Sequence, residues 1–91
     1  MHHIVAGNAR GAAESRKILQ RFDIDINDAT NGVFLPATRA SPNPTGAAVH
    51  STLHTKSYYK GVHELLKKAR TRAEAENILQ QIRQRLLAGG L

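Results

Sequence analysis

The chain has 91 residues, enough for one domain with a single thin core. Its thirteen Lys and Arg against seven Asp and Glu give a formal net charge of +6, which favours polyanionic partners and above all nucleic acid. The absence of cysteine excludes disulfide frameworks, thiol catalysis and thiolate zinc sites, and no apolar run is long enough to cross a bilayer, so we expect no membrane insertion.

The first half of the chain is expected to alternate extended segments with one helix. Residues 2–6 suggest a short strand, and two histidines directly after Met1 suggest a domain cut from a longer polypeptide. Residues 11–22 form an amphipathic helix by apolar spacing. The Asn- and Asp-rich residues 23–28 indicate turns, and residues 33–35 a second short strand that follows an Asn-Gly turn.

The second half is expected to be mostly helical. A loop rich in proline covers residues 36–46, and a helix begins near Thr45 or Gly46 and runs to about Thr55. A break before Ser57 separates it from a helix that runs to about Arg70, because the apolar residues on the two sides would otherwise face different ways. The sequence Thr71-Arg72-Ala73-Glu74 is typical of a capping box and opens a last helix, which Gly89-Gly90 end. The fold class predicted is α+β, mostly helical.

Four of the five histidines fall in two close pairs. His50 and His54 are four residues apart, so on a helix both imidazoles project from one face and suit a shared metal ion, although a solvated pair is the plainer alternative. His2 and His3 are neighbours, so on a strand they point to opposite faces. A remnant of an affinity tag is the alternative there, but tags normally carry more histidines and a linker. His63 is expected on the surface.

The order of these features indicates a β-β-α metal finger: a His pair at a first strand, Asn31-Gly32 leading into a second, then His50-Ser51-Thr52-Leu53-His54 on a helix. Alone, Asn31 would be only half of a turn. Together with the blocks at residues 2–7, 18–28, 31–36 and 50–55 and with Tyr58-Tyr59, the order resembles the AHH family, nuclease domains of the HNH/endonuclease VII superfamily found in bacterial polymorphic toxins. The resemblance covers roughly residues 2–70. It departs at Met1, where the family has alanine, and at Asp23, where glycine would suit a left-handed helix end.

This resemblance implies a ββα-metal (His-Me) finger with added helices in a single domain, residues 1–91. Residues 2–55 would be the finger, with an inserted helix near 11–22, and residues 57–88 the C-terminal helices. His3 would be the general base, and Asn31 would tie the strands together and hold the His3 ring. His2, His50 and His54 would hold one divalent metal ion, of which zinc, nickel, magnesium and manganese are all candidates.

Substrate contacts are expected from a basic stretch that follows the metal helix and is opposed there only by Glu64, although a solvated helix face is the alternative. Its members are Lys56, Lys60, Lys67, Lys68, Arg70 and Arg72. Tyr58 and Tyr59 are expected to pack rather than to stack on bases.

The function expected is therefore a metal-dependent endonuclease that hydrolyses DNA with little sequence preference. Cleavage of RNA and a non-catalytic basic nucleic-acid-binding module are the alternatives. The resemblance to toxins further implies a cognate immunity protein, export or delivery as part of a larger toxin, and action in the cytoplasm of a target cell.

Overall fold

The computed structural model describes residues 2–35 and 55–89 of the chain. In these residues it has three α-helices, two short 3-10 helices and a two-stranded antiparallel sheet. In chain order the elements are β1 (His2–His3), η1 (Arg10–Ala12), α1 (Ala13–Arg21), η2 (Ala29–Asn31), β2 (Gly32–Val33), α2 (Lys56–Leu66) and α3 (Arg72–Leu87). The predicted proline-rich loop and the helix near residues 45–55, with His50 and His54, lie outside the described residues.

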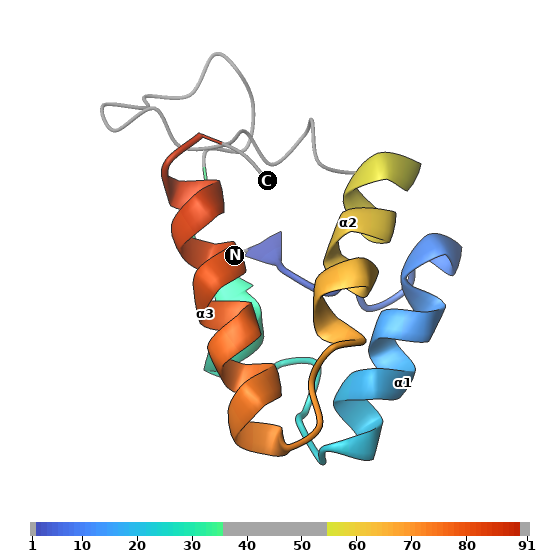
Figure 1. Ribbon diagram of the computed structural model, residues 1–91. Coiled ribbons are helices and arrows are strands. Elements are labelled where there is room, and N and C mark those ends of the chain that lie inside the picture. The colour runs from blue at the N-terminus through green and yellow to red at the C-terminus, as the bar shows by residue number, and fades with distance from the viewer. Residues whose placement is uncertain (1, 36–54, 90–91) are drawn as a thin grey trace.

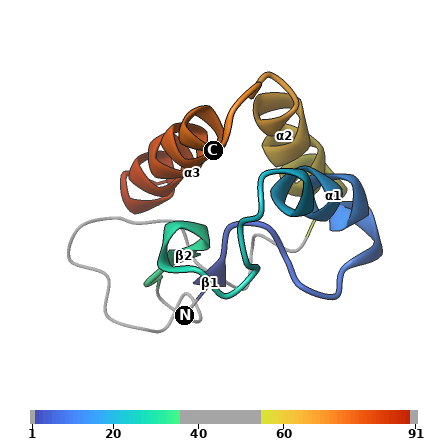
Figure 2. The same ribbon diagram turned by 90° about the horizontal axis from the view of Figure 1, so that it is seen from below.

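Helix α2 packs against α1 on one side and α3 on the other (Figure 1). In the view from below, the β1–β2 pair lies to one side of the helices, between α3 and the α1–α2 pair (Figure 2). The mostly helical α+β class is confirmed by this arrangement, which is compatible with the nuclease fold. The helix that would complete a ββα finger falls in the segment that is not described.

The strands are shorter than residues 2–6 and 33–35 suggested, since only His2 pairs with Val33 and His3 with Gly32. Directly after β1, Ile4 and Val5 are both buried, so the chain enters the core instead of alternating between two faces. The Val5 amide donates to the side-chain oxygen of Asn31 at 2.8 Å. The Ile4 amide still donates to the backbone carbonyl of Asn31 at 2.7 Å, and one residue later the Asn31 side chain takes the place of a backbone partner.

Helix α1 covers most of the predicted range 11–22 and ends at Arg21 with a left-handed residue, Asp23, at φ 59°. The Asp23 amide donates to the Gln20 carbonyl at 3.1 Å, and the Ile24 amide donates to the Leu19 carbonyl at 2.9 Å. Both bonds satisfy carbonyls at the helix end, the arrangement that usually selects glycine. The expected left-handed stop is therefore present, with Asp in the glycine position.

Helix α2 ends at Leu66, four residues before the predicted Arg70. The amides of Lys68 and Ala69 donate to carbonyls only three residues back, at 3.3 and 3.0 Å, so the chain tightens into a turn. Ala69 is buried in that turn. Ala69 keeps the helical spacing of apolar residues although it lies past the end of α2. The spacing therefore predicted a helix end that is too late.

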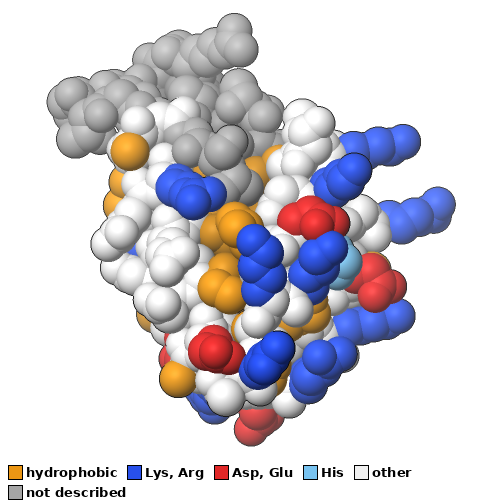
Figure 3. Space-filling view, viewed as in Figure 1, with side chains coloured by type: hydrophobic (Ala, Val, Ile, Leu, Met, Phe, Trp, Pro, Cys, Tyr) orange, Lys and Arg blue, Asp and Glu red, His pale blue; other side chains and the backbone are white. Residues whose placement is uncertain are grey.

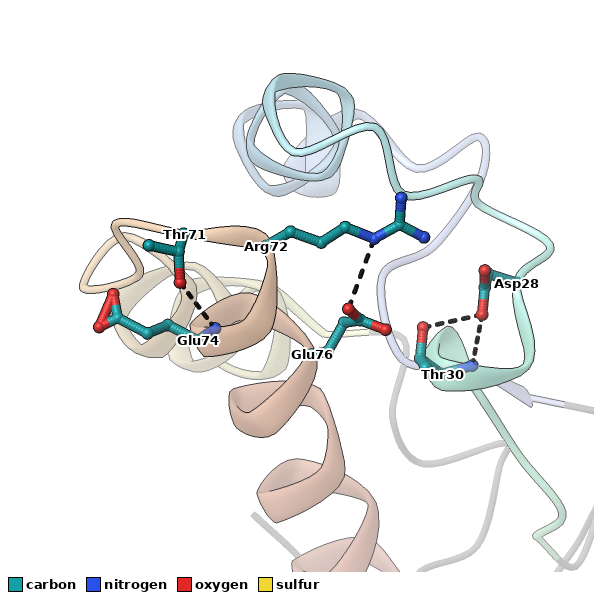
Figure 4. A network of polar contacts seen from close by, with 6 residues as sticks. All are labelled: Asp28, Thr30, Thr71, Arg72, Glu74 and Glu76. Carbon is teal, nitrogen blue, oxygen red and sulfur yellow. Dashed lines mark hydrogen bonds and ion pairs between the residues drawn. The ribbon is translucent and has the colours of Figure 1, made fainter.

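The capping box at the start of α3 is confirmed. The Thr71 hydroxyl accepts from the Glu74 amide at 3.1 Å (Figure 4). The Glu74 carboxylate in turn accepts from the Arg70 amide at 2.9 Å, one residue before the usual position. At its far end α3 gives way to Gly89, whose φ of 124° is in the region that favours glycine.

The core is built from buried apolar residues of the three α-helices, η1, β2 and the segments beside them, and α3 supplies Ala75, Leu79, Ile82 and Leu86. Helix α3 also contacts the strand region by a polar route, because Arg83 donates to the carbonyls of Gly32 at 3.2 Å and Ala29 at 3.4 Å. None of the described helices combines the length and apolarity that a membrane span requires.

Candidate active site

Asn31 is fully buried and joins the two segments that carry the candidate site. Its oxygen accepts from the Val5 amide at 2.8 Å, and its nitrogen donates to the carbonyls of Val5 at 3.1 Å and Ile26 at 2.8 Å. Both donor hydrogens and one acceptor position of the amide are thus used. The side chain fixes the residues after β1 against the loop that precedes β2.

The His2 ring is buried, with 3% of its surface exposed, and lies edge-on to Tyr58 with the ring centroids 5.7 Å apart. The Tyr58 hydroxyl donates its single hydrogen to the Ile4 carbonyl at 2.7 Å and lies 3.0 Å from His2 Nε2. Nε2 must therefore be the donor to Tyr58, which leaves the lone pair of a neutral His2 ring on Nδ1. Burial raises the pKa of Tyr58 well above its usual range, so its hydroxyl keeps its proton.

The His3 ring is only half-buried, and its surroundings differ from those of His2. Its Nε2 lies 3.0 Å from the side-chain oxygen of Asn27, in the loop before η2. Asn31 bonds the backbone on either side of the strand region, as expected of a residue that ties the two strands together. The ring itself bonds the side-chain oxygen of Asn27, so Asn31 acts on His3 through the backbone and not by a bond to the ring.

Residues 1–87 match the model of a family described as "a nuclease family of the HNH/ENDO VII superfamily with conserved AHH". The chain belongs to this AHH family. The match extends past the expected residues 2–70 and includes all of α3. Membership identifies the chain as a nuclease, a hydrolase acting on nucleic acid. No curated protein and no solved structure matches the chain at significant similarity.

By residue order, the AHH motif in this chain is Met1-His2-His3, with methionine in place of alanine. The two histidines of the motif are the pair whose rings have such different neighbours. One ring is enclosed and bonded to a tyrosine, and the other is half-open and bonded to an asparagine. Two adjacent imidazoles in such different surroundings can serve two different chemical roles.

The residues expected to hold a metal ion fit that role only in part within the described chain. Across residues 2–35 and 55–89, no three His, Asp or Glu side chains gather as a metal site would require. His2 has suitable chemistry, since a ligating imidazole usually donates its other ring nitrogen to a protein acceptor, as His2 Nε2 does to Tyr58. His50 and His54, and with them the convergence expected on one ion, lie outside the described residues.

The six basic residues expected to contact substrate are all exposed, on α2, on the turn that follows it and at the start of α3: Lys56, Lys60, Lys67, Lys68, Arg70 and Arg72. Two of them have acidic partners, Lys67 with Glu64 at 2.6 Å and Arg72 with Glu76 at 3.4 Å. The hydrogen bond from Lys67 holds the pKa of Glu64 below its usual value. Such exposed pairs are weak and leave both cations accessible to phosphate.

Basic side chains gather over the side of the molecule formed by α1 and α2 (Figure 3). A groove of about 270 Å³ runs between these helices, and Lys17 and Arg21 of α1 line it together with Lys67. Lys17 and Arg21 were not among the basic residues expected from the sequence. Their charge was visible in the sequence, but their position beside α2 depends on the packing of two helices that are far apart in the chain.

Asn27 and the polar contact of Tyr58 were also missed. Tyr58 was expected to pack, which its burial confirms, but its bonds to His2 and Ile4 span more than fifty residues. Asn27 lies in a segment whose Asn and Asp content indicated turns, which gave no reason to connect it with His3.

Proposed function

We propose that this AHH domain is a metal-dependent endonuclease that hydrolyses phosphodiester bonds of DNA with little sequence preference. The observation that carries the proposal is the unequal environment of His2 and His3. A buried, hydrogen-bonded ring suits a fixed ligand, whereas a half-open ring suits proton transfer with a water molecule.

In the proposed mechanism His3 accepts the proton of the attacking water. With its Nε2 donating to Asn27, the ring of a neutral His3 presents Nδ1 as the basic nitrogen. A neutral imidazole has one basic nitrogen, and histidine is a common general base in catalysis for that reason. Asn31 keeps the strand that carries His3 in register with the loop that carries Asn27.

His2, through Nδ1, and His50 and His54 would hold a single divalent cation. When bound, the cation would neutralise charge on the scissile phosphate and on the departing oxygen. An all-imidazole set favours zinc or nickel, and turnover with magnesium or manganese fits the same role.

The basic residues of α1, α2 and the following turn support DNA as the substrate. Lysine and arginine contact phosphates without reading bases, which agrees with low sequence preference. RNA has the same backbone charge, so cleavage of RNA is the second candidate. The likeness to toxin domains supports a role in competition between bacteria, with delivery inside a larger polypeptide to a target cytoplasm and an immunity protein that protects the producing cell.

The test is incubation of the purified domain with supercoiled plasmid and with total RNA, each with and without a chelator. We expect plasmid nicking that the chelator abolishes. His3→Ala should remove it, and Asn8→Ala, at an exposed position between β1 and η1, should retain it. Loss of RNA with intact plasmid would select the second candidate. A retarded but uncut plasmid would instead indicate a binding module without turnover.

A further inference from the structure

We propose that Asn27 is a positioning residue for His3, which fixes the tautomer and the direction of the ring so that Nδ1 faces the attacking water. The inference rests on the proposed role of His3 as the base. It adds a residue that neither the sequence motif nor the family description includes.

The first support is the contact itself. The Asn27 side-chain oxygen lies 3.0 Å from His3 Nε2, an ordinary hydrogen-bond length. An amide oxygen can only accept, so Nε2 carries the hydrogen and Nδ1 carries the lone pair of the neutral ring. A base whose proton sits on the wrong nitrogen cannot act, so the acceptor on Nε2 decides whether Nδ1 is available.

The second support is that Asn27 is held from both sides. Its backbone amide donates to the Asp25 carboxylate at 2.7 Å. The carbonyl of the preceding residue, Ile26, accepts from the buried side chain of Asn31 at 2.8 Å. Asn31 also bonds both backbone groups of Val5, two residues after His3. The donor and the acceptor of the His3–Asn27 bond are therefore placed by one buried amide.

Hydrogen bonds also hold the loop after Asn27, and so they help to keep the Asn27 side-chain oxygen near His3. The Asp28 carboxylate accepts from the amide and the hydroxyl of Thr30, both at 3.0 Å (Figure 4). These hydrogen bonds are the main reason why the pKa of the Asp28 carboxyl is lowered. Asn27, by contrast, has an exposed side chain. The Asn27 side chain therefore makes no contribution to the core, and its bond to His3 is what it adds to the strand region.

The test compares Asn27→Ala, Asn27→Asp and the control Asn8→Ala, an exposed asparagine outside the loop, in steady-state nicking of plasmid DNA. Asn27→Ala should lower kcat by about 10- to 100-fold with little change in KM, the range seen when a hydrogen-bond partner of a site histidine is removed. Asn27→Asp keeps an acceptor oxygen and should recover most of kcat, whereas its charge should raise KM. Asn8→Ala should match the wild type.

A readout independent of turnover is the long-range proton–nitrogen NMR spectrum of the imidazoles near pH 8, with His3 assigned by comparison with His3→Ala. The wild type should show His3 with hydrogen on Nε2. An Nδ1–H form would overturn the inference, as would unchanged kcat in Asn27→Ala while His3→Ala is inactive. Wild-type protein that cuts neither DNA nor RNA, or an active His3→Ala, would contradict the proposed function instead.

Discussion

Tyr58 is the residue that makes the two histidines of the motif unequal. Its hydroxyl donates to the Ile4 carbonyl and accepts from His2 Nε2, so a single oxygen satisfies two buried polar groups at the end of β1. Its ring also packs edge-on against the buried His2 ring. His3 is half-buried and bonds the side-chain oxygen of Asn27. In the proposed mechanism, the different roles of His2 and His3 therefore depend in part on one tyrosine from α2.

Replacing Tyr58 by phenylalanine should destabilise the fold by about 2–4 kcal/mol, because the His2 N–H and the Ile4 carbonyl would both lose a buried partner. Urea denaturation followed by circular dichroism measures the change as a shift in midpoint at constant slope. If the proposed metal site is right, the same variant should also bind the cation about 10- to 100-fold more weakly. A midpoint equal to that of the wild type would show that the hydroxyl contributes nothing.

At the scale of single elements, the end of α1 has a residue that fits its backbone poorly. Asp23 adopts φ 59°, a conformation in which a side chain costs energy and glycine does not. Its carboxylate is also next to the negative end of the helix dipole. The hydrogen bonds of Asp23 and Ile24 nevertheless hold the turn in place.

Asp23→Gly should therefore stabilise the protein by about 0.5–1 kcal/mol, seen as a higher urea midpoint. Asp23→Ala is the matched control, since it removes the charge but keeps a Cβ at positive φ, and it should give no such gain. Equal stabilisation by both variants would assign the effect to charge and not to the backbone.

The elements also show what the sequence could and could not predict. Helices α1 and α3 follow from apolar spacing and capping residues, which are local signals, and both were predicted close to their observed bounds. The end of α2 was misplaced because Ala69 keeps helical spacing while it lies in a turn. The His pair and Asn31 came from a family motif, whereas the bond of Asn27 to His3 joins residues 24 apart and has no local signature.

At the scale of the whole molecule, the site depends on helices that do not contain it. A sheet of two residue pairs has too few bonds to be stable alone. It is held by the core and by Arg83 of α3, which bonds the carbonyls of Ala29 and Gly32 on both sides of Asn31. Helix α3 therefore stabilises the strand region through Arg83 and the shared core, and this gives α3 a structural role.

Because the helices and strands share one thin core, a cavity beside α3 should lower the stability of the strand region and of the whole fold together. Leu79 is fully buried, and Leu79→Ala should cost about 2–5 kcal/mol. Leu87 on the same helix is 41% exposed, so Leu87→Ala is the control and should cost less than about 1 kcal/mol.

For Leu79→Ala we expect the urea midpoints of circular dichroism and of the His2 and His3 ring signals to fall together, by about 1–3 M. Their coincidence follows from cooperative unfolding, in which strands without their supporting helix have no stable state of their own. Histidine signals that keep the wild-type midpoint while the helical signal shifts would show that the strand region folds independently of α3. In that case the bonds from Arg83 to Ala29 and Gly32 would be too weak to couple the helix to the active-site strands.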